Sequence, residues 1–340
     1  MKNIKTIDIL FIVVILFFIY GIADIYKKNN SKNIDLSIDK GINFLYKKQT
    51  DDGNFIFLQC KNKNMEKCDR ENSLGFMWII DPLHGIDDER IQTITNRALN
   101  FIQDKQLSEG LWQYLIILPP DIDTTSIAAN TLKKFGRNIS YNQTLIDENK
   151  NEAGLYYTWI VGEDKEKTPW EKNDIDCVVN VNVLRNRHTN DRAICEYVND
   201  AIQNKKQCSI YYEYDDKKFS AYYFFSKAYL EGVTCLEESK NAIINYILSE
   251  KKPDGSFGTH LETAFAINTL LNFNYSGDEI KKGIEYLISK QRKNGSWEGG
   301  VAWTNTQKTR FFGSDELTTA IALEALYKYK NSLHKNVPKN

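Results

Sequence analysis

Three shortages in this 340-residue chain narrow its interpretation before any motif is considered. It contains only six prolines, and helical periods recur along it without runs of alternating strand-like segments, so a fold built on sheets is not expected. Its formal net charge is −1, which gives no electrostatic case for binding nucleic acid. What remains is a chain long enough for a large, mainly helical domain with a sizeable core.

A long apolar run occurs in residues 1–28, which differ from the rest of the chain. The stretch from Ile9 to Ala23 is almost unbroken and has lysines on both sides. It is close to the lower limit of about 17 to 25 residues that a helix needs to span a bilayer. We expect a single-pass N-terminal membrane anchor, followed by a polar linker over residues 29–35. Cleavage as a signal peptide before Asp24 is the alternative.

The six cysteines favour a body outside the cytosol. Cys60 and Cys68 lie close together in a polar stretch, and an even cysteine count is typical of disulfides in an oxidising compartment. The alternative is six reduced thiols, with Cys177 among the buried ones. The spacing of Cys60 and Cys68 is too wide for a zinc knuckle.

One sequence unit is repeated along the chain and is clearest at residues 282–297, KGIEYLISKQRKNGSW. Ile284, Leu287 and Ile288 form the apolar stripe of a helix, after which come a glutamine, an Asn-Gly turn and a tryptophan. Looser copies place their turn glycines at Gly53, Gly110, Gly154, Gly255 and Gly295. A recurrence of this length indicates a repeat architecture.

Each turn is followed by a second and more apolar helix. These helices are expected at residues 72–80, 124–135, 177–184, 219–230, 261–271 and 317–327. A helix that is apolar nearly all round is buried on more than one side. Pairing each of them with an amphipathic helix predicts an all-α fold, a single α/α6 toroid over residues 36–330. The repeat helices form its outer ring, the second helices form its inner ring, and a polar tail follows over residues 331–340.

The unit at residues 282–297 resembles the QW repeat of the squalene–hopene and oxidosqualene cyclases. The residues that fill the pattern are Lys282, Gly283, Tyr286, Leu287, Gln291, Gly295 and Trp297. The resemblance implies the toroid of the terpene-cyclase and protein-prenyltransferase superfamily. The prenyltransferase zinc pattern, an Asp-x-Cys with a later histidine, is absent because Asp176 and Cys177 are adjacent. Neither zinc nor protein prenylation is therefore expected.

The stretch DIDTT at residues 121–125 resembles the DxDD or DxDTT motif of class II terpene cyclases. The resemblance implies that Asp123 is the general acid that protonates an alkene or epoxide, with Asp121 and Thr124 as its hydrogen-bonding supports. Such an acid must stay neutral in an apolar pocket, and burial and a like-charged neighbour both raise the pKa of a carboxyl group. The alternative is that Asp123 only caps the helix.

Other expected inner helices also begin with acidic residues. These are Asp174, Asp176, Glu262, Asp315 and Glu316. Parallel inner helices would bring them to one end of the central cavity, where they could hold a divalent cation, oppose a cationic ligand, or divide acid and base roles. We expect no cofactor, and a divalent cation at these acids is the alternative.

The sequence thus predicts a class II terpene cyclase-like protein that binds a hydrophobic isoprenoid-like ligand. Class II cyclases usually form the active site between two α-domains, so the single toroid implies a partner subunit or a lid, for which residues 303–312 are candidates. One alternative is an extracytoplasmic glycan-active α/α6 enzyme that uses paired carboxylates. Another is a non-catalytic toroid that binds a peptide, a lipid or a sugar. The tyrosines over residues 211–223 either pack in the core or line the cavity.

Overall fold

The protein, seen in a computed structural model, is described for residues 32–168 and 172–335. The expected membrane anchor over residues 1–28 lies outside the described residues. Within them, no helix combines the length and apolar character needed to cross a bilayer. The last helix runs further than the sequence indicates and takes in the first residues of the expected polar tail.

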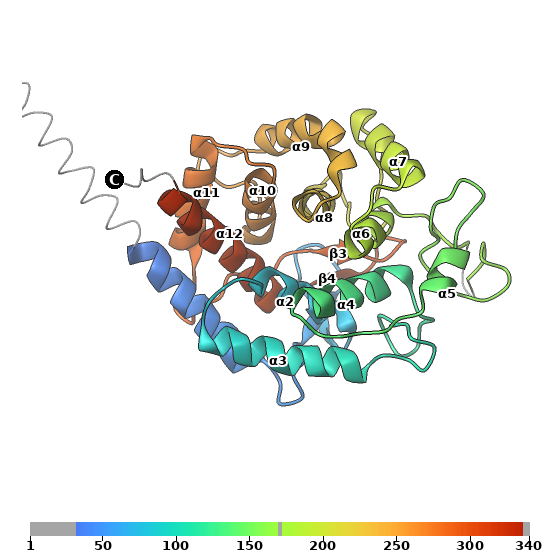
Figure 1. Ribbon diagram of the computed structural model, residues 1–340. Coiled ribbons are helices and arrows are strands. Elements are labelled where there is room, and N and C mark those ends of the chain that lie inside the picture. Colours follow the sequence, from blue (N-terminus) through green and yellow to red (C-terminus); the bar gives the residue numbers. More distant parts are fainter. Residues whose placement is uncertain (1–31, 169–171, 336–340) are drawn as a thin grey trace, which may run out of the picture.

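Six helical segments form an inner ring (Figure 1). In chain order they are the segment made of η1 Leu74–Phe76, α2 Met77–Ile80 and η2 Asp81–Leu83, then α4 Ile122–Lys134, α6 Cys177–Arg187, α8 Phe219–Leu230, α10 His260–Asn272 and α12 Asp315–Lys335. Each contacts the next around the ring, and α12 returns to contact α2. Their side chains are buried nearly all round, as expected for helices enclosed by a second layer.

A second set of helices surrounds this ring. It consists of the helix at 32–48, α3 Glu89–Asp104, α5 Gln143–Glu148, α7 Arg192–Gln203, α9 Glu237–Ser249 with η3 Thr234–Leu236 before it, and α11 Asp278–Lys290. These helices bury one face and expose the other, which their amphipathic sequences predict. The two rings of helices expected from the sequence, one inside the other, are therefore present.

The turn after α11 ties the last outer helix to the first. The side-chain amide of Gln291 donates to the carbonyl of Gly295 at 3.0 Å and to that of Ser37 at 2.8 Å. The indole N–H of Trp297 donates back to the carbonyl of Leu287 at 2.7 Å. Gly295 has a φ of +94°, and a Cβ there would lie 2.2 Å from the carbonyl oxygen of Lys40. Only glycine therefore allows this close approach.

A small antiparallel sheet departs from the all-helical expectation. Its strands are β1 Phe57–Cys60, β2 Cys68–Glu71, β3 Trp303–Thr304 and β4 Phe311–Gly313, in the order β2-β1-β4-β3. It joins the loop after the first outer helix to the loop before α12, with Gln59 opposite Phe312. Each strand is too short to show alternation in the sequence, and the two loops meet only because the ring closes. The loop over residues 303–312 is thereby held as a two-stranded flap.

All six cysteines are paired. The disulfides are Cys60–Cys68, Cys177–Cys208 and Cys195–Cys235. The first closes the β1–β2 hairpin, as the sequence suggested, and the third joins α7 to η3 in the outer layer. The second ties the first residue of inner helix α6 to the loop that follows α7. The alternative of six reduced thiols is wrong for this structure.

Candidate active site

A cavity of about 180 Å³ opens at the end of the inner ring where α4 and α6 begin. Its wall is mostly apolar and aromatic, with Leu74, Met77, Trp78, Ile127, Val179, Trp303 and Phe312 among the lining side chains. Trp78 and Trp303 lie with their ring centroids 6.4 Å apart, and Tyr212 is within 6.5 Å of both. Tyrosines of the 211–223 stretch thus both line the cavity and pack in the core.

Asp123 lies in the first turn of α4 and lines this cavity. Its Oδ2 accepts a hydrogen bond from the hydroxyl of Tyr212 at 2.6 Å, and its Oδ1 accepts one from the amide of Asn182 at 2.8 Å. Burial raises the pKa of Asp123 to about 6, against the opposing effect of these two hydrogen bonds, and the charge of Asp174 adds to the rise. The carboxyl group is therefore half protonated at about pH 6, well above the range of an ordinary aspartate.

Asp121 is the residue that caps α4. Its Oδ1 accepts from the backbone N–H of Thr124 at 2.6 Å, and its Oδ2 accepts from that of Tyr114 at 3.2 Å. Burial raises its pKa to about 7, and the neighbouring Asp123 contributes to the rise. The alternative in which Asp123 serves as the helix cap is wrong, because Asp121 takes that place. Thr124 supports Asp121, whereas the hydrogen-bond donors to Asp123 are Tyr212 and Asn182.

Asp174 lies beside the cavity and is reached through two of its lining residues. Thr158 donates its hydroxyl to Oδ2 of Asp174 at 2.5 Å, and Tyr211 donates to Oδ1 at 2.8 Å. Both donors line the cavity, whereas Asp174 itself does not. The structure thus brings Asp174 close to the site predicted from the sequence, as a neighbour whose charge raises the pKa of Asp123.

Asp176 caps α6 and holds the loop that carries the two tyrosines. Its Oδ1 accepts from the N–H of Val178 at 2.7 Å. Its Oδ2 accepts from the hydroxyl of Ser209 and from the N–H of Ile210, both at 2.7 Å. Burial raises its pKa to about 7. Together with the disulfide from Cys177, these bonds fix the backbone immediately before the tyrosines of the cavity wall.

The remaining sequence-predicted acids do not line the cavity. Glu262 forms a capping box with Thr259 at the start of α10. Asp315 accepts from Arg292 at 2.7 Å at the edge of α12, and burial raises the pKa of Glu316 beside it. In residues 32–168 and 172–335, no three acidic, histidine or cysteine side chains lie close enough together to hold a metal ion.

The hydrogen-bonding partners of Asp123 were missed by sequence reasoning. A signal for Asn182 was present, because α6 is apolar apart from asparagines and a polar residue inside a fully buried helix needs a partner. Oδ1 of Asn182 is buried and has no hydrogen-bond partner in the described structure. Tyr212 belongs to the stretch over residues 211–223, for which lining the cavity was one of two alternatives, but nothing in the sequence indicated its hydrogen bond to Asp123.

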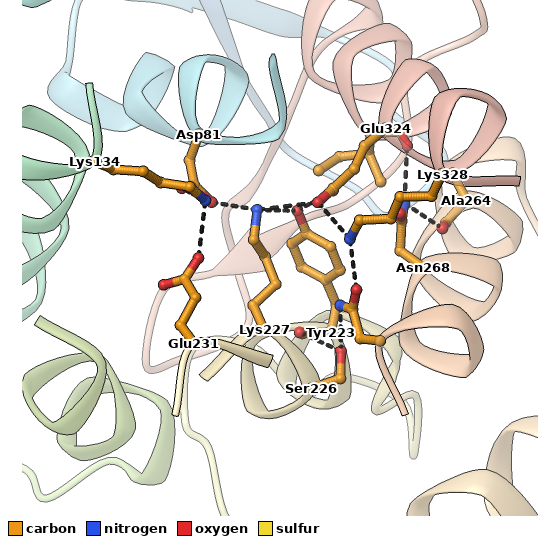
Figure 2. A network of polar contacts seen from close by, with 12 residues as sticks. Asp81, Lys134, Tyr223, Ser226, Lys227, Glu231, Ala264, Asn268, Glu324 and Lys328 are labelled. Atoms are coloured by element: carbon orange, nitrogen blue, oxygen red, sulfur yellow. Dashed lines mark hydrogen bonds and ion pairs between the residues drawn. The ribbon is translucent and has the colours of Figure 1, made fainter. Parts of the chain in front are cut away.

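The opposite end of the inner ring holds a buried charge network that the sequence did not indicate (Figure 2). Asp81 contacts Arg185 at 2.8 Å, Lys134 at 3.0 Å and Lys227. Burial alone would raise the pKa of Asp81, but these three cations hold it well below its usual range.

Two glutamates complete this charge network. Glu231 contacts Arg185 at 2.5 Å and Lys134 at 2.8 Å. Glu324 accepts from Tyr223 at 2.6 Å and contacts Lys328 at 2.9 Å. The nearby cations lower the pKa of Glu324 to about 2, although its burial acts in the other direction. Every carboxylate of the network is therefore ionised near neutral pH.

An aromatic layer separates the charge network from the candidate active site. A gap of only about 10 Å³ is lined by Asp81 and Tyr223 of the network and by Trp78 and Trp303 of the cavity wall. A space of this size holds one water molecule at most. The cavity is therefore closed at this end.

Comparison with known proteins supports the fold. The sequence matches no protein-family model and no curated protein. Among solved structures, a variant of the type II terpene cyclase MstE from Scytonema, in complex with its product merosterolic acid A, is similar with a TM-score of 0.69 and 16% identity. The match covers 89% of this chain and 99% of that one. The same cyclase has also been solved in complex with its substrate, geranylgeranyl dihydroxybenzoate.

Two further structures show the same likeness. A protein from Actinoplanes matches with a TM-score of 0.68 and 15% identity, over 87% of this chain and 99% of that one. The ent-copalyl diphosphate synthase from Streptomyces platensis matches with a TM-score of 0.57 and 16% identity, over 75% of this chain and 50% of that one. At these identities the likeness establishes a terpene cyclase-like toroid and leaves the chemistry to be argued from the site.

Proposed function

We propose that the protein is a class II terpene cyclase-like enzyme in which Asp123 starts the cyclisation of an isoprenoid by protonating it. The observation that carries this proposal is the state of the Asp123 carboxyl. It lines an apolar, aromatic cavity, its hydrogen-bond partners are neutral, and its pKa is raised to about 6. A general acid works best when its pKa lies near the working pH.

In the reaction, the electron pair of a substrate double bond takes the proton of Asp123 and forms a new C–H bond. The adjacent carbon becomes a carbocation, which the next double bond attacks to close a ring. Trp78, Trp303 and Tyr212 line the space in which this charge travels, and ring faces stabilise cations. Loss of a proton from the final cation ends the sequence. No cofactor is required for these steps.

The neighbours of Asp123 suit both of its protonation states. Tyr212 and Asn182 donate to the ionised carboxylate. Burial holds the pKa of Tyr212 well above its usual value, so Tyr212 stays a donor. When Asp123 is protonated, rotation of the Asn182 amide would present its unpartnered Oδ1 as an acceptor. Asn182 can therefore form a hydrogen bond to either protonation state of Asp123, as a donor or as an acceptor.

The structural neighbours support this proposal for a single toroid. The match to MstE spans 99% of that chain, so a type II cyclase of comparable extent exists without a further domain in the same chain. We therefore propose a site formed by one chain, to whose wall the β3–β4 flap supplies Trp303 and Phe312. The apolar lining argues against the glycan-active alternative, since sugar sites need many polar contacts.

We also propose that the body works outside the cytosol, attached through the apolar segment at residues 1–28. The three disulfides support an oxidising compartment. An isoprenoid ligand would partition into the adjacent membrane, so a tethered enzyme would lie close to its substrate.

The test is the variant Asp123→Asn, which keeps the size of the side chain and removes its acidity. We expect cyclised product from prenylated aromatic or polyprenyl substrates to fall to background, while the melting temperature stays close to that of the wild type. Asp315→Asn is the matched control, because Asp315 also begins an inner helix but lies outside the cavity. Cyclisation retained in Asp123→Asn would refute the proposal.

A further inference from the structure

The charges that line the cavity point to the class of its substrate. Resting on the proposed function, we infer that the isoprenoid substrate has an uncharged head, such as an alcohol or a prenylated phenol, rather than a diphosphate. The inference rests on the positions of the cations and of the helix ends around the cavity. The presence of a general acid does not by itself distinguish the two kinds of substrate.

The described part of the cavity wall holds two acidic side chains and no basic one. Asp121 and Asp123 are the ionisable carboxylates among the described lining residues, and none of those residues is a lysine, an arginine or a histidine. Diphosphates are held in proteins by arginine and lysine side chains, which match their charge and their oxygen geometry. A diphosphate in this cavity would instead meet two carboxyl groups, whose ionised forms repel it strongly in surroundings of low dielectric constant.

Helix N-termini can also bind phosphate, but backbone N–H groups at the starts of α4 and α6 are already bonded to carboxylates of the chain. α4 and α6 both begin beside the cavity, and free backbone N–H groups at such ends attract anions. At α4 the N–H of Thr124 is already bound by Asp121 at 2.6 Å. At α6 the N–H of Val178 is bound by Asp176 at 2.7 Å. Each end is thus capped by an internal carboxylate, which neutralises the attraction for an outside anion.

Lys308 is a cation close to the wall, and its ammonium group is already bound. It donates to the carbonyl of Glu213 at 2.6 Å, to the hydroxyl of Thr304 at 3.0 Å and to the carbonyl of Ile210. An ammonium has three N–H donors, so these partners use all of them. Burial lowers the pKa of Lys308, against the opposing effect of the charges of Asp176 and Glu213. Lys308 therefore joins the β3–β4 flap to the loop that carries Tyr211 and Tyr212.

The polar part of the wall suits a neutral group. Thr158, Tyr211, Thr304 and Asn305 line the cavity with hydroxyl and amide groups. Four cations of the inner helices lie at the other end of the ring and are paired there with carboxylates, namely Lys134, Arg185, Lys227 and Lys328 (Figure 2). Trp78 and Trp303 lie between this network and the cavity. Hydroxyl and amide groups can exchange hydrogen bonds with an alcohol or a phenol without a net charge on either side.

The experiment compares two ligands with the same chain, geranylgeraniol and geranylgeranyl diphosphate. Binding to the full-length protein is followed by tryptophan fluorescence, since Trp78 and Trp303 line the cavity, and products are analysed in parallel. We expect the alcohol to bind at least about tenfold more tightly than the diphosphate. Equal or tighter binding of the diphosphate, or no binding of the alcohol, would overturn the inference.

The same data separate this inference from the proposed function. Binding of the alcohol without any cyclised product upholds the inference and counts against the cyclase. Cyclisation of the diphosphate in preference to the alcohol upholds the cyclase and overturns the inference. Each result therefore bears on one claim without leaving the other open.

A matched pair of variants tests whether diphosphate binds weakly because no cation lies among the described cavity-lining residues. Leu118 lines the cavity, whereas Ile117 is 83% exposed and does not. We expect Leu118→Arg to tighten diphosphate binding by at least about tenfold and Ile117→Arg to leave it unchanged. Equal effects of the two variants would overturn the inference, and so would a loss of diphosphate binding in Lys308→Gln.

Discussion

The two ends of the inner ring both bury carboxylates, yet they leave them in opposite states. Asp123 meets a hydroxyl and an amide, and its pKa rises to about 6. Asp81 meets Arg185, Lys134 and Lys227, and its pKa falls well below the usual range. Burial is complete at Asp81, so burial alone does not decide whether a carboxyl is neutral. The charge of the partner residues decides whether a buried carboxyl is protonated. One ring of helices can therefore hold both a reactive acid and an inert carboxylate.

The parallel direction of the inner helices explains why the ends differ. Helix N-termini favour anions and C-termini favour cations. Asp121 and Asp176 accordingly cap the helices at the cavity end. Lys134, Arg185 and Lys227 lie in the last turns at the other end. The cations at that end then require Asp81 and its neighbours to balance them, whereas no cation lies beside Asp121 and Asp123 among the described residues that line the cavity.

The largest effect is expected when the balanced end is broken. Asp81→Asn would leave three buried cations without their shared carboxylate and should lower the free energy of unfolding by about 3–5 kcal/mol. Asp123→Asn removes a carboxylate that has no cation and should change it by less than about 1 kcal/mol at pH 5. Urea denaturation of both variants beside the wild type measures the difference.

The stability of the wild type and of Asp123→Asn should also depend differently on pH. A carboxyl whose pKa is raised on folding binds its proton more tightly in the folded state, so the wild type loses stability as the pH rises from about 4 through about 6. Asp123→Asn lacks that loss, and at pH 8 it should be more stable than the wild type by about 1–3 kcal/mol. A variant less stable at pH 8 than the wild type would contradict the assignment of a neutral buried acid.

The disulfides offer a second contrast between the site and the outer layer. Cys177–Cys208 and Cys195–Cys235 close loops of similar sequence separation, 31 and 40 residues. Replacing either pair with alanine should cost about 3–4 kcal/mol of stability. Turnover should fall about tenfold or more only in the Cys177/Cys208 variant, because that bond holds the loop that carries Tyr212.

Product formation by the two double variants, measured well below their melting temperatures, tests this expectation. Wild-type protein reduced with dithiothreitol should lose turnover to the same extent as the Cys177/Cys208 variant. Equal turnover in the two variants would show that the loop keeps its place without the bond.

The smallest effect concerns the pKa of the acid itself. Tyr212 donates to the ionised form of Asp123 and so lowers its pKa. Tyr212→Phe should raise that pKa by about one unit, and activity, which needs the protonated acid, should persist to correspondingly higher pH. Tyr211→Phe is the control, because Tyr211 donates to Asp174 instead. A pH–rate profile of each variant gives the comparison, and a shift to lower pH in Tyr212→Phe would contradict it.

Much of the fold was predictable because it is periodic. The apolar stripes and turn glycines recur along the chain, and Gly53 and Gly295 have the positive φ values that the turns require. The sheet was not predictable, because β1 and β4 come from loops that lie far apart in the sequence, with Gln59 opposite Phe312, and meet only in the closed ring. Local sequence records local preferences, and such pairings depend on the whole structure.

The candidate site was predictable in part for the same reason. Asp121 and Asp123 share one short motif with a fixed place at the start of a helix, so local reasoning could place them. Asp176, Tyr212 and Asn182 come together through a disulfide and a loop, and their roles depend on three-dimensional neighbours. The charge network depends likewise on five segments, η2, α4, α6, α8 and α12, that reach one end of the ring.

The closure of the ring also bears on how the chain folds. The amide of Gln291 bonds to the carbonyl of Ser37, 254 residues earlier, and Lys330 pairs with Asp35 at 2.6 Å. During synthesis the first outer helix must therefore wait for nearly the whole chain before its partner emerges. Contacts of such sequence separation slow folding and leave apolar surface exposed meanwhile. The open, unfinished ring is the species that a chaperone would have to protect.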